Sequence, residues 1–182
     1  MPAAASAEKA DRDKPITIEA DKLLHDELKQ ISIFSGRAVL TKGTMVLRGE
    51  RIEVRQDPEG YQFGLVLPEA NQRAFFRQKR EGVDEYLEGE AQRIDYDGRA
   101  DRIVLSEHAE IRRLRGTTLG DQLSGKRIVY DNLSDVFTID GQPGADKNKT
   151  PDARVRATLV PRNKLPEAMP DKAAPSDKQN KK

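Results

Sequence analysis

The sequence predicts an all-β protein made of short antiparallel strands. Apolar and polar residues alternate with a period of two along most of the chain, which is the pattern of strands that bury one face. Glycine, proline, asparagine and aspartate interrupt the alternation at short intervals, as tight turns between strands require. No segment keeps a helical pattern for more than about two turns, and the best helical candidate, residues 23–28, is short.

The alternation is clearest in a series of short segments. Ile52 and Val54, for example, alternate with three charged residues, so that one face of this segment is apolar and the other is charged. We expect strands at residues 16–18, 31–33, 45–47, 52–54, 94–96, 103–105, 128–130, 137–139 and 155–159.

Turn residues separate these strands. Residues 57–60 (DPEG) place Asp, Pro and Gly where a type I turn favours them. Asp97-Gly98 stands between segments 94–96 and 103–105 and is a hairpin signal. The pattern therefore indicates many short strands joined by tight turns.

The folded part of the chain repeats itself after about 70 residues, as arrays of one supersecondary unit do. Residues 19–23 (EADKL) resemble residues 90–94 (EAQRI). After a small insertion, residues 49–52 (GERI) resemble residues 125–128 (GKRI). We therefore predict two copies of a β-meander whose strands stack in layers.

The two ends of the chain differ in composition from its centre. Residues 1–14 contain small and charged residues, and their Ala-rich start is typical of what signal-peptide removal leaves, which predicts export. Residues 163–182 carry several prolines and many lysines and are expected to form a disordered tail. Residues 15–162 are then a single β domain.

Composition excludes several classes of protein. The 32 Lys and Arg residues against 31 Asp and Glu give a net charge of +1, which argues against a dedicated nucleic-acid binder. The absence of Cys excludes disulfide scaffolds and thiol catalysis. No run of about 18 apolar residues is present to span a membrane as a helix. Because mean hydropathy is only -0.77, the apolar residues must be concentrated on the inner faces of the strands.

No group of residues points to catalysis, to a metal or to a cofactor. His25 and His108 lie far apart without partners at metal-ligand spacing, and we interpret both as surface residues. Glu88 and Asp95 each have a second acid two positions away, as a carboxylate pair would, but such pairs arise by chance in so acidic a chain. The basic run at residues 112–115 suits either phosphate binding or a solvated sheet face.

The strands at the two ends of the domain are predicted to be sheet edges. Residues 16–18 open the domain, and residues 153–160 close it after a Gly-, Pro- and Asn-rich stretch. An exposed edge can pair with another chain, although charged side chains such as Arg154 and Arg156 also protect edges from pairing. The predicted docking edges comprise Ile16, Thr17, Ile18, Arg154, Val155, Arg156, Ala157, Thr158 and Leu159.

The inner strand faces are expected to meet about 10 Å apart, as packed sheets do. With only four Tyr and five Phe, the interior is lined mainly by aliphatic residues. It is either a packed core or a slot for an aliphatic ligand.

A series of segments, taken in order, also matches one known family. They are residues 16–22 (ITIEADK), 34–40 (FSGRAVL), 49–54 (GERIEV), 88–91 (EGEA) and 123–130 (LSGKRIVY). Together they resemble the LptA, or OstA-like, family of periplasmic lipopolysaccharide-export proteins. The resemblance extends over residues 15–162, and only residues 57–71 depart from it as an apparent insert.

The resemblance implies an OstA-like β-jellyroll of about sixteen short antiparallel strands around a continuous apolar interior. It also implies a bridge that carries lipopolysaccharide, with its acyl chains in an apolar groove. The implied partners are lipopolysaccharide, an inner-membrane-anchored LptC-like protein, an outer-membrane LptD-like translocon and further copies of the chain, stacked head to tail. The implied groove residues are Ile16, Ile18, Phe34, Ala38, Leu40, Met45, Leu47, Phe75, Ile94, Tyr96 and Ile128.

Two other functions stay open at this point. The same fold suits a periplasmic docking domain of the same transport line, with a single partner. A carbohydrate-active β-enzyme that uses Glu88 or Asp95 is the third possibility.

Overall fold

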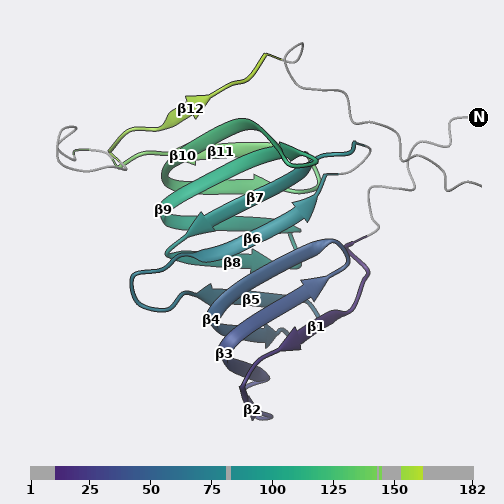
Figure 1. Cartoon of the computed structure of the whole chain (residues 1–182). Coiled ribbons are helices and arrows are strands. Elements are labelled where there is room, and N and C mark those ends of the chain that lie inside the picture. The colour runs from purple at the N-terminus through teal and green to yellow at the C-terminus, as the bar shows by residue number, and fades with distance from the viewer. Residues whose placement is uncertain (1–10, 81–82, 143, 145–152, 162–182) are drawn as a thin grey trace, which may run out of the picture.

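The computed structural model describes residues 11–80, 83–142, 144 and 153–161. These residues form a 12-stranded antiparallel sheet, and no α-helix is present among them (Figure 1). The predicted all-β antiparallel class is therefore confirmed. The tail at residues 163–182 and most of the segment 1–14 lie outside the described residues.

From β1 to β11 the strands succeed one another along the chain with short connections, and a longer segment separates β11 from β12. Their bounds are β1 (Ile16–Glu19), β2 (Lys22–Asp26), β3 (Ile31–Lys42), β4 (Met45–Gln56), β5 (Gln62–Leu67), β6 (Ala74–Lys79), β7 (Tyr86–Ala91), β8 (Arg93–Asp97), β9 (Arg102–Arg115), β10 (Thr118–Asp131), β11 (Val136–Asp140) and β12 (Arg156–Thr158).

The helical candidate at residues 23–28 is an extended strand and turn instead. β2 pairs with the first half of β3, from Lys22 opposite Ser35 to Asp26 opposite Ile31. A segment this short gains little from a lone helical turn, because helix nucleation is costly. The ladder with β3 supplies backbone hydrogen bonds that the isolated turn lacks, so tertiary pairing decides its conformation.

Four long strands, β3, β4, β9 and β10, have 12–14 residues each and change direction near their middle. The β3–β4 ladder shifts register between Ser35 and Ala38, where Gly36 and Arg37 have φ values of 84° and 48°. The β9–β10 ladder shifts in the same way at Glu107 and His108, with φ values of 62° and 53°. A β-bulge bends a strand and increases its twist, so each long strand contributes one half to each of two layers.

Divided at the bulges, the molecule has two layers of eight strand segments. One layer contains β2, β5, β8, β11, the first halves of β3 and β9 and the second halves of β4 and β10. The other contains β1, β6, β7, β12 and the remaining four halves. Twelve strands therefore provide sixteen segments, in agreement with the jellyroll that the resemblance implied.

The pairing scheme occurs twice along the chain. The pairs β1–β3, β2–β3, β3–β4, β4–β5 and β4–β6 recur as β7–β9, β8–β9, β9–β10, β10–β11 and β10–β12. The predicted repeat is therefore confirmed, each copy having six strands. Residues 57–71, which looked like an insert, contain β5, and β5 is the equivalent of β11 in the second copy.

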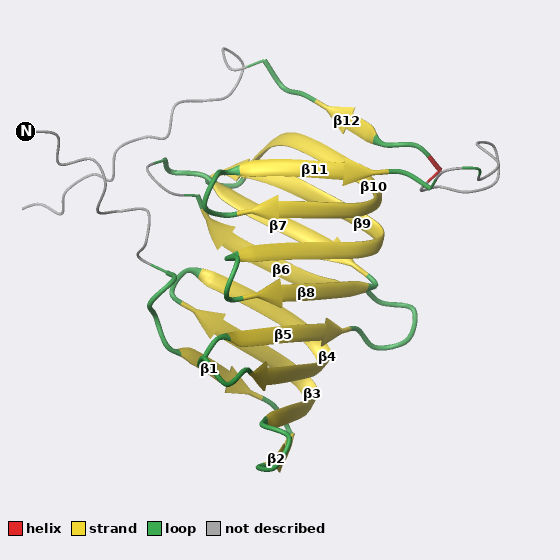
Figure 2. Ribbon diagram, turned by 180° about the vertical axis from the view of Figure 1, so that it is seen from behind, coloured by secondary structure: helices red, strands yellow, loops and turns green. Residues whose placement is uncertain are grey.

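The two copies are connected by two strand pairings, β5 with β8 and β6 with β7, which we call the internal joint. The internal joint stacks the copies along one axis, so that β1 and β2 lie at one end of the molecule and β11 and β12 at the other (Figure 2). Within the described residues, each of these four strands pairs on one side only.

Candidate functional site

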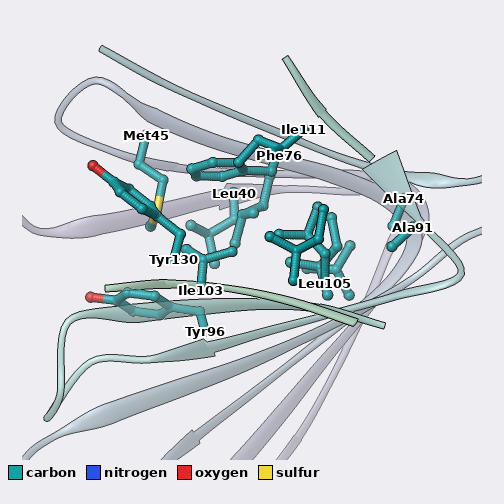
Figure 3. Packing of buried hydrophobic residues seen from close by; sticks show 14 of the residues in the cluster. Leu40, Met45, Ala74, Phe76, Ala91, Tyr96, Ile103, Leu105, Ile111 and Tyr130 are labelled. Carbon is teal, nitrogen blue, oxygen red and sulfur yellow. The ribbon is translucent and has the colours of Figure 1, made fainter. Parts of the chain in front are cut away.

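An apolar interior runs between the two layers and through both copies of the repeat. Its residues alternate along the strands with outward-facing polar residues, as strands packed on one face do. In Figure 3, Leu40 and Phe76 from one layer lie across from Ile103 and Leu105 of the other. The buried members, each at most 3% exposed, are Ala38, Leu40, Met45, Leu47, Ile52, Val66, Ala74, Phe76, Leu87, Ala91, Ile94, Tyr96, Ile103, Leu105, Ala109, Ile111, Ile128 and Tyr130.

The interior is less completely covered at the two ends of the molecule. At the β1 end, Ile16, Ile18 and Phe34 pack against the core but are only partly buried. At the other end, Phe137 and Ile139 of β11 do the same. The apolar interior thus continues from one set of edge strands to the other.

The structure places ten of the eleven predicted groove residues on this interior. Seven are buried, namely Ala38, Leu40, Met45, Leu47, Ile94, Tyr96 and Ile128. Three more, Ile16, Ile18 and Phe34, pack against it from the β1 end.

Phe75 is the exception, and the prediction that it faces the interior is wrong. Phe75 is opposite Arg48 in the β4–β6 ladder, and the Arg48 guanidinium lies 4.1 Å from the centroid of its ring on the outer face. The neighbouring Phe76 is fully buried instead. The alternation of side chains along β6 indicates which phenylalanine is buried. Phe75 shares its face with Arg77 and Lys79, whereas Phe76 shares its face with Ala74.

Several interior residues of the second copy were missed by reading the sequence. Leu105 is opposite Ile128 of β10, as Phe34 is opposite Ile52 of β4. Ile111 is opposite Leu123, as Leu40 is opposite Leu47. Tyr130 is the equivalent of Val54. Because Phe34 and Leu40 are among the predicted groove residues, the repeat could have identified Leu105 and Ile111 by transfer of positions from one copy to the other.

A buried polar contact joins the two layers on the side opposite the bulges. Lys42 Nζ, at the end of β3 in one layer, donates a hydrogen bond to Tyr96 Oη of the other layer at 3.0 Å. Burial lowers the pKa of Lys42, although the nearby Asp101 carboxylate opposes this effect. Burial also raises the pKa of Tyr96 to about 12, with Asp101 and Asp97 adding to the shift. Both residues are buried, with Lys42 8% and Tyr96 3% exposed.

A second cross-layer contact lies further along the same side. Arg80, which follows β6 in one layer, is paired with Asp135 in the turn between β10 and β11 of the other. Tyr130 Oη donates to the same Asp135 carboxylate at 3.1 Å. Burial, followed by the Asp135 charge, raises the pKa of Tyr130. Unlike the bulged side, where the backbone of four strands connects the layers, this side is closed at these points by side chains.

The candidate catalytic carboxylates lie on outer faces and are paired with arginines. Glu88 accepts a hydrogen bond from Arg77 at 2.6 Å, and Asp95 accepts two from Arg93 at 2.7 and 2.6 Å. Each carboxylate is therefore engaged by a neighbouring cation, and the chemistry of a glycosidase pair is not assembled here.

The basic run is engaged in ion pairs as well. Arg112 pairs with Glu90 at 3.2 Å and Arg113 with Asp121 at 2.7 Å, and Arg115 lies 3.1 Å from a Glu85 oxygen. Any phosphate at this face would compete with carboxylates already in place. Within the described residues, no three His, Cys, Asp or Glu side chains gather as a metal site.

The predicted docking edges lie at opposite ends of the molecule, as Figure 1 shows. Ile16, Thr17 and Ile18 belong to β1, and residues 154–159 include β12, which pairs with β10 between Gln122 and Ser124. In the part of the chain that the structure describes, no helix is long and apolar enough to cross a membrane.

Comparison with known proteins gives consistent results. The family described as "LptA/(LptD N-terminal domain) LPS transport protein" matches residues 17–136. The lipopolysaccharide export system protein LptH of Pseudomonas aeruginosa is 24% identical over 155 residues, which are 85% of this chain and 84% of LptH. LptA of Escherichia coli K12 is 27% identical over 151 residues, which are 83% of this chain and 74% of LptA.

A solved structure shows the same fold. The crystal structure of LptH, the LptA-homologous periplasmic component of the lipopolysaccharide transport device of Pseudomonas aeruginosa, superposes with a TM-score of 0.70 at 22% identity. The matched region covers 84% of this chain and 99% of the LptH chain. Since the family match covers more than half of the sequence, this chain belongs to the family of LptA and the N-terminal domain of LptD, the LPS transport proteins.

Proposed function

We propose that this chain is a periplasmic carrier that holds the acyl chains of lipopolysaccharide between its two β-layers and passes them to the next component of the transport line. The observation that carries the proposal is the apolar interior, which runs through both copies and is only partly covered at both ends. The relatives are named as lipopolysaccharide export proteins rather than enzymes, which supports this substrate and a role without catalysis.

Acyl chains suit such an interior on energetic grounds. Transfer of each CH₂ group from water to an apolar site yields about 0.8 kcal/mol, so a lipid with several chains is held without specific polar contacts. The wall is mainly aliphatic, and it therefore resists sliding little along its length. A conduit needs both properties, because it must release what it binds.

The interior has to widen before it can accept a lipid, because its side chains fill it in this structure. The bulged strands connect the layers through the backbone on one side, whereas Lys42–Tyr96 and Arg80–Asp135 connect them through side chains on the other. We expect the layers to separate on the latter side. The sugar and phosphate headgroup then stays outside, near the arginines and lysines at the rim.

The two ends suit a bridge between membranes. Edge strands can extend a sheet into a neighbouring protein by β-augmentation. At the β1–β2 end, Ile16, Thr17 and Ile18 would meet an inner-membrane-anchored LptC-like protein or another copy. At the β11–β12 end, residues 154–159 would meet another copy or the outer-membrane LptD-like translocon. Residues 15–162 are the part that performs this task.

Photo-crosslinking tests where the lipid lies. A photoreactive amino acid replaces Tyr96 or Tyr130 in the interior and, as a matched control, Phe63, an outer-face aromatic whose ring lies 5.0 Å from the Arg55 guanidinium. With purified lipopolysaccharide and folded protein, we expect crosslinks from both interior positions and not from Phe63. Crosslinks from Phe63 alone, or from no position, would refute an interior carrier and favour a docking domain that binds a single protein partner.

A further inference from the structure

We infer that two copies of this chain join end to end in one defined register, which is the register of the internal joint. The inference rests on the end-to-end stacking in the proposed function and adds its residue pairs. By the repeat, β1 and β2 are the equivalents of β7 and β8, and β11 and β12 are the equivalents of β5 and β6. The two ends of the molecule therefore carry the same four strands that the internal joint pairs.

The internal register can be transferred directly to the ends. In the internal joint, Phe76 is opposite Gly89, and Val66 is opposite Ile94 in the other layer. Phe76 of the first copy corresponds to Ala157 of the second copy. Phe76 is paired with Leu47, and Ala157 is paired with the equivalent leucine, Leu123. The same transfer gives the pairs for a joint between molecules. They are Ala157 opposite Ile18, Ile139 opposite Leu23 and Leu159 opposite Ile16 of the second copy.

Side-chain volumes are complementary where Ala157 meets Ile18 of the second copy. In the internal joint a large residue, Phe76, faces Gly89, and a Cβ on Gly89 would lie 3.3 Å from the Phe76 ring and 2.6 Å from Leu105. At the proposed joint the small residue is Ala157 and the large one is Ile18 of the second copy. Large and small have exchanged strands at this pair, so the pair keeps one bulky side chain on the inner face of the joint.

The charged residues are complementary as well. Across the internal joint, Arg73 donates to Glu90 at 2.8 Å. Their equivalents are Arg154 and Glu19, and neither forms an ion pair with any other described residue. Arg156 would also lie directly opposite Glu19 of the second copy, because Phe75 is opposite Glu90 internally. Opposite charges at facing positions stabilise a strand pair.

A second ion pair of the internal joint has no counterpart at the ends of the molecule, because both of its charged residues are replaced there. Arg77 pairs with Glu88 at 2.6 Å inside the molecule. The equivalent residues at the ends are Thr158 and Thr17. Removal of only one partner would leave an unpaired charge at the joint, whereas two threonines form a favourable cross-strand pair.

Apolar side chains are exposed on these edges in the single chain. Leu23 on β2 is 56% exposed and Leu159 beside β12 is 70% exposed. A joint in the internal register covers them with strands of the second copy. Because the two ends are different surfaces, such contacts are heterologous and continue from copy to copy.

Disulfide trapping tests the register. The chain has no Cys, so introduced cysteines react only with each other. One full-length preparation carries Ala157→Cys, and a second carries Ile18→Cys or, as the control, Ile16→Cys. Opposite residues of an antiparallel pair have Cα atoms about 4.5–5.5 Å apart, within disulfide range, whereas a neighbour two positions along lies about 7–8 Å away. We expect several-fold more mixed dimer with Ile18→Cys than with Ile16→Cys.

Charge reversal provides an independent measurement. Glu19→Arg alone, and Arg154→Glu combined with Arg156→Glu, should each reduce the oligomer fraction seen by light scattering, and the three substitutions together should restore it. Glu69→Arg, on the exposed connection between β5 and β6, is the control for charge alone. Preference for Ile16→Cys, or no restoration in the triple variant, would overturn the register while leaving the stacking intact. Absence of both oligomers and mixed dimers in every preparation would overturn the stacking itself.

Discussion

The assignment of Phe76 to the interior and Phe75 to the outer face can be tested by comparing Phe76→Ala with Phe75→Ala. Phe76 is fully buried between the layers, so its truncation leaves a cavity among aliphatic neighbours. Such substitutions in protein cores cost about 3–5 kcal/mol. Phe75 is only partly buried and covered by the Arg48 guanidinium, a contact worth about 0.5–1 kcal/mol at an exposed site.

These magnitudes translate into a measurable difference in unfolding. Urea unfolding of domains of this size has a slope of about 1–3 kcal/mol per M. A loss of about 4 kcal/mol in Phe76→Ala therefore lowers the midpoint by about 2 M, and the loss in Phe75→Ala lowers it by about 0.5 M. Circular dichroism at a β-sheet wavelength follows both transitions. A loss in Phe75→Ala as large as in Phe76→Ala would refute the assignment of faces, because the outer ring leaves no enclosed cavity.

The interior and its boundaries can be tested at three more positions, Tyr96, Gly49 and Lys42. Burial raises the pKa of Tyr96 to about 12, above the unfolded value of about 10. The stability gained from its neutral hydroxyl is therefore complete below pH ~10 and is lost as the pH rises to about 12. The free energy of unfolding of Tyr96→Phe should fall less steeply over that range, and equal slopes would contradict the burial. A Cβ on Gly49 would lie 2.6 Å from the Leu67 carbonyl oxygen, so Gly49→Ala should cost about 1–3 kcal/mol in thermal or urea unfolding. Gly116→Asn is the control, because Gly116 has a positive φ and open space around it, and a similar loss in both variants would argue against crowding at Gly49. Lys42→Met removes the hydrogen bond to Tyr96 while keeping most of the side-chain bulk, and it should speed the association of lipopolysaccharide measured by stopped-flow fluorescence. An unchanged rate would show that this contact does not limit opening.

Much of the fold could be read from local pattern. The alternation at Ile52 and Val54 reports a strand with one buried face, because side chains of a strand point to opposite sides in turn. The same rule applied to residues 74–79 would have selected Phe76 instead of Phe75, since Arg77 and Lys79 share the face of Phe75. The position that the family resemblance implies, Phe75, thus conflicts with the period of the strand, which the structure follows.

Other features depend on residues that are far apart in the sequence. Nothing local marks Glu107 and His108 as a bulge, because a positive φ at these residues follows from the pairing of β9 with β10. Likewise, the strand at Lys22–Asp26 is formed because β3 pairs with it. Once the structure shows the bulge at Arg37, the repeat gives the place of the second bulge, since Arg37 and His108 hold equivalent places.

The sequence by itself determined that the protein is a repeated, alternating β-structure with an aliphatic inner face and an edge strand near each end. These properties are local, since they depend on side-chain period, turn residues and the spacing between similar segments. Only the tertiary structure decided which half of each long strand enters which layer, how the two copies join and where side chains such as Lys42 and Tyr96 close the interior. These depend on strand register and on the bend at each bulge, which bring together residues that no local pattern relates.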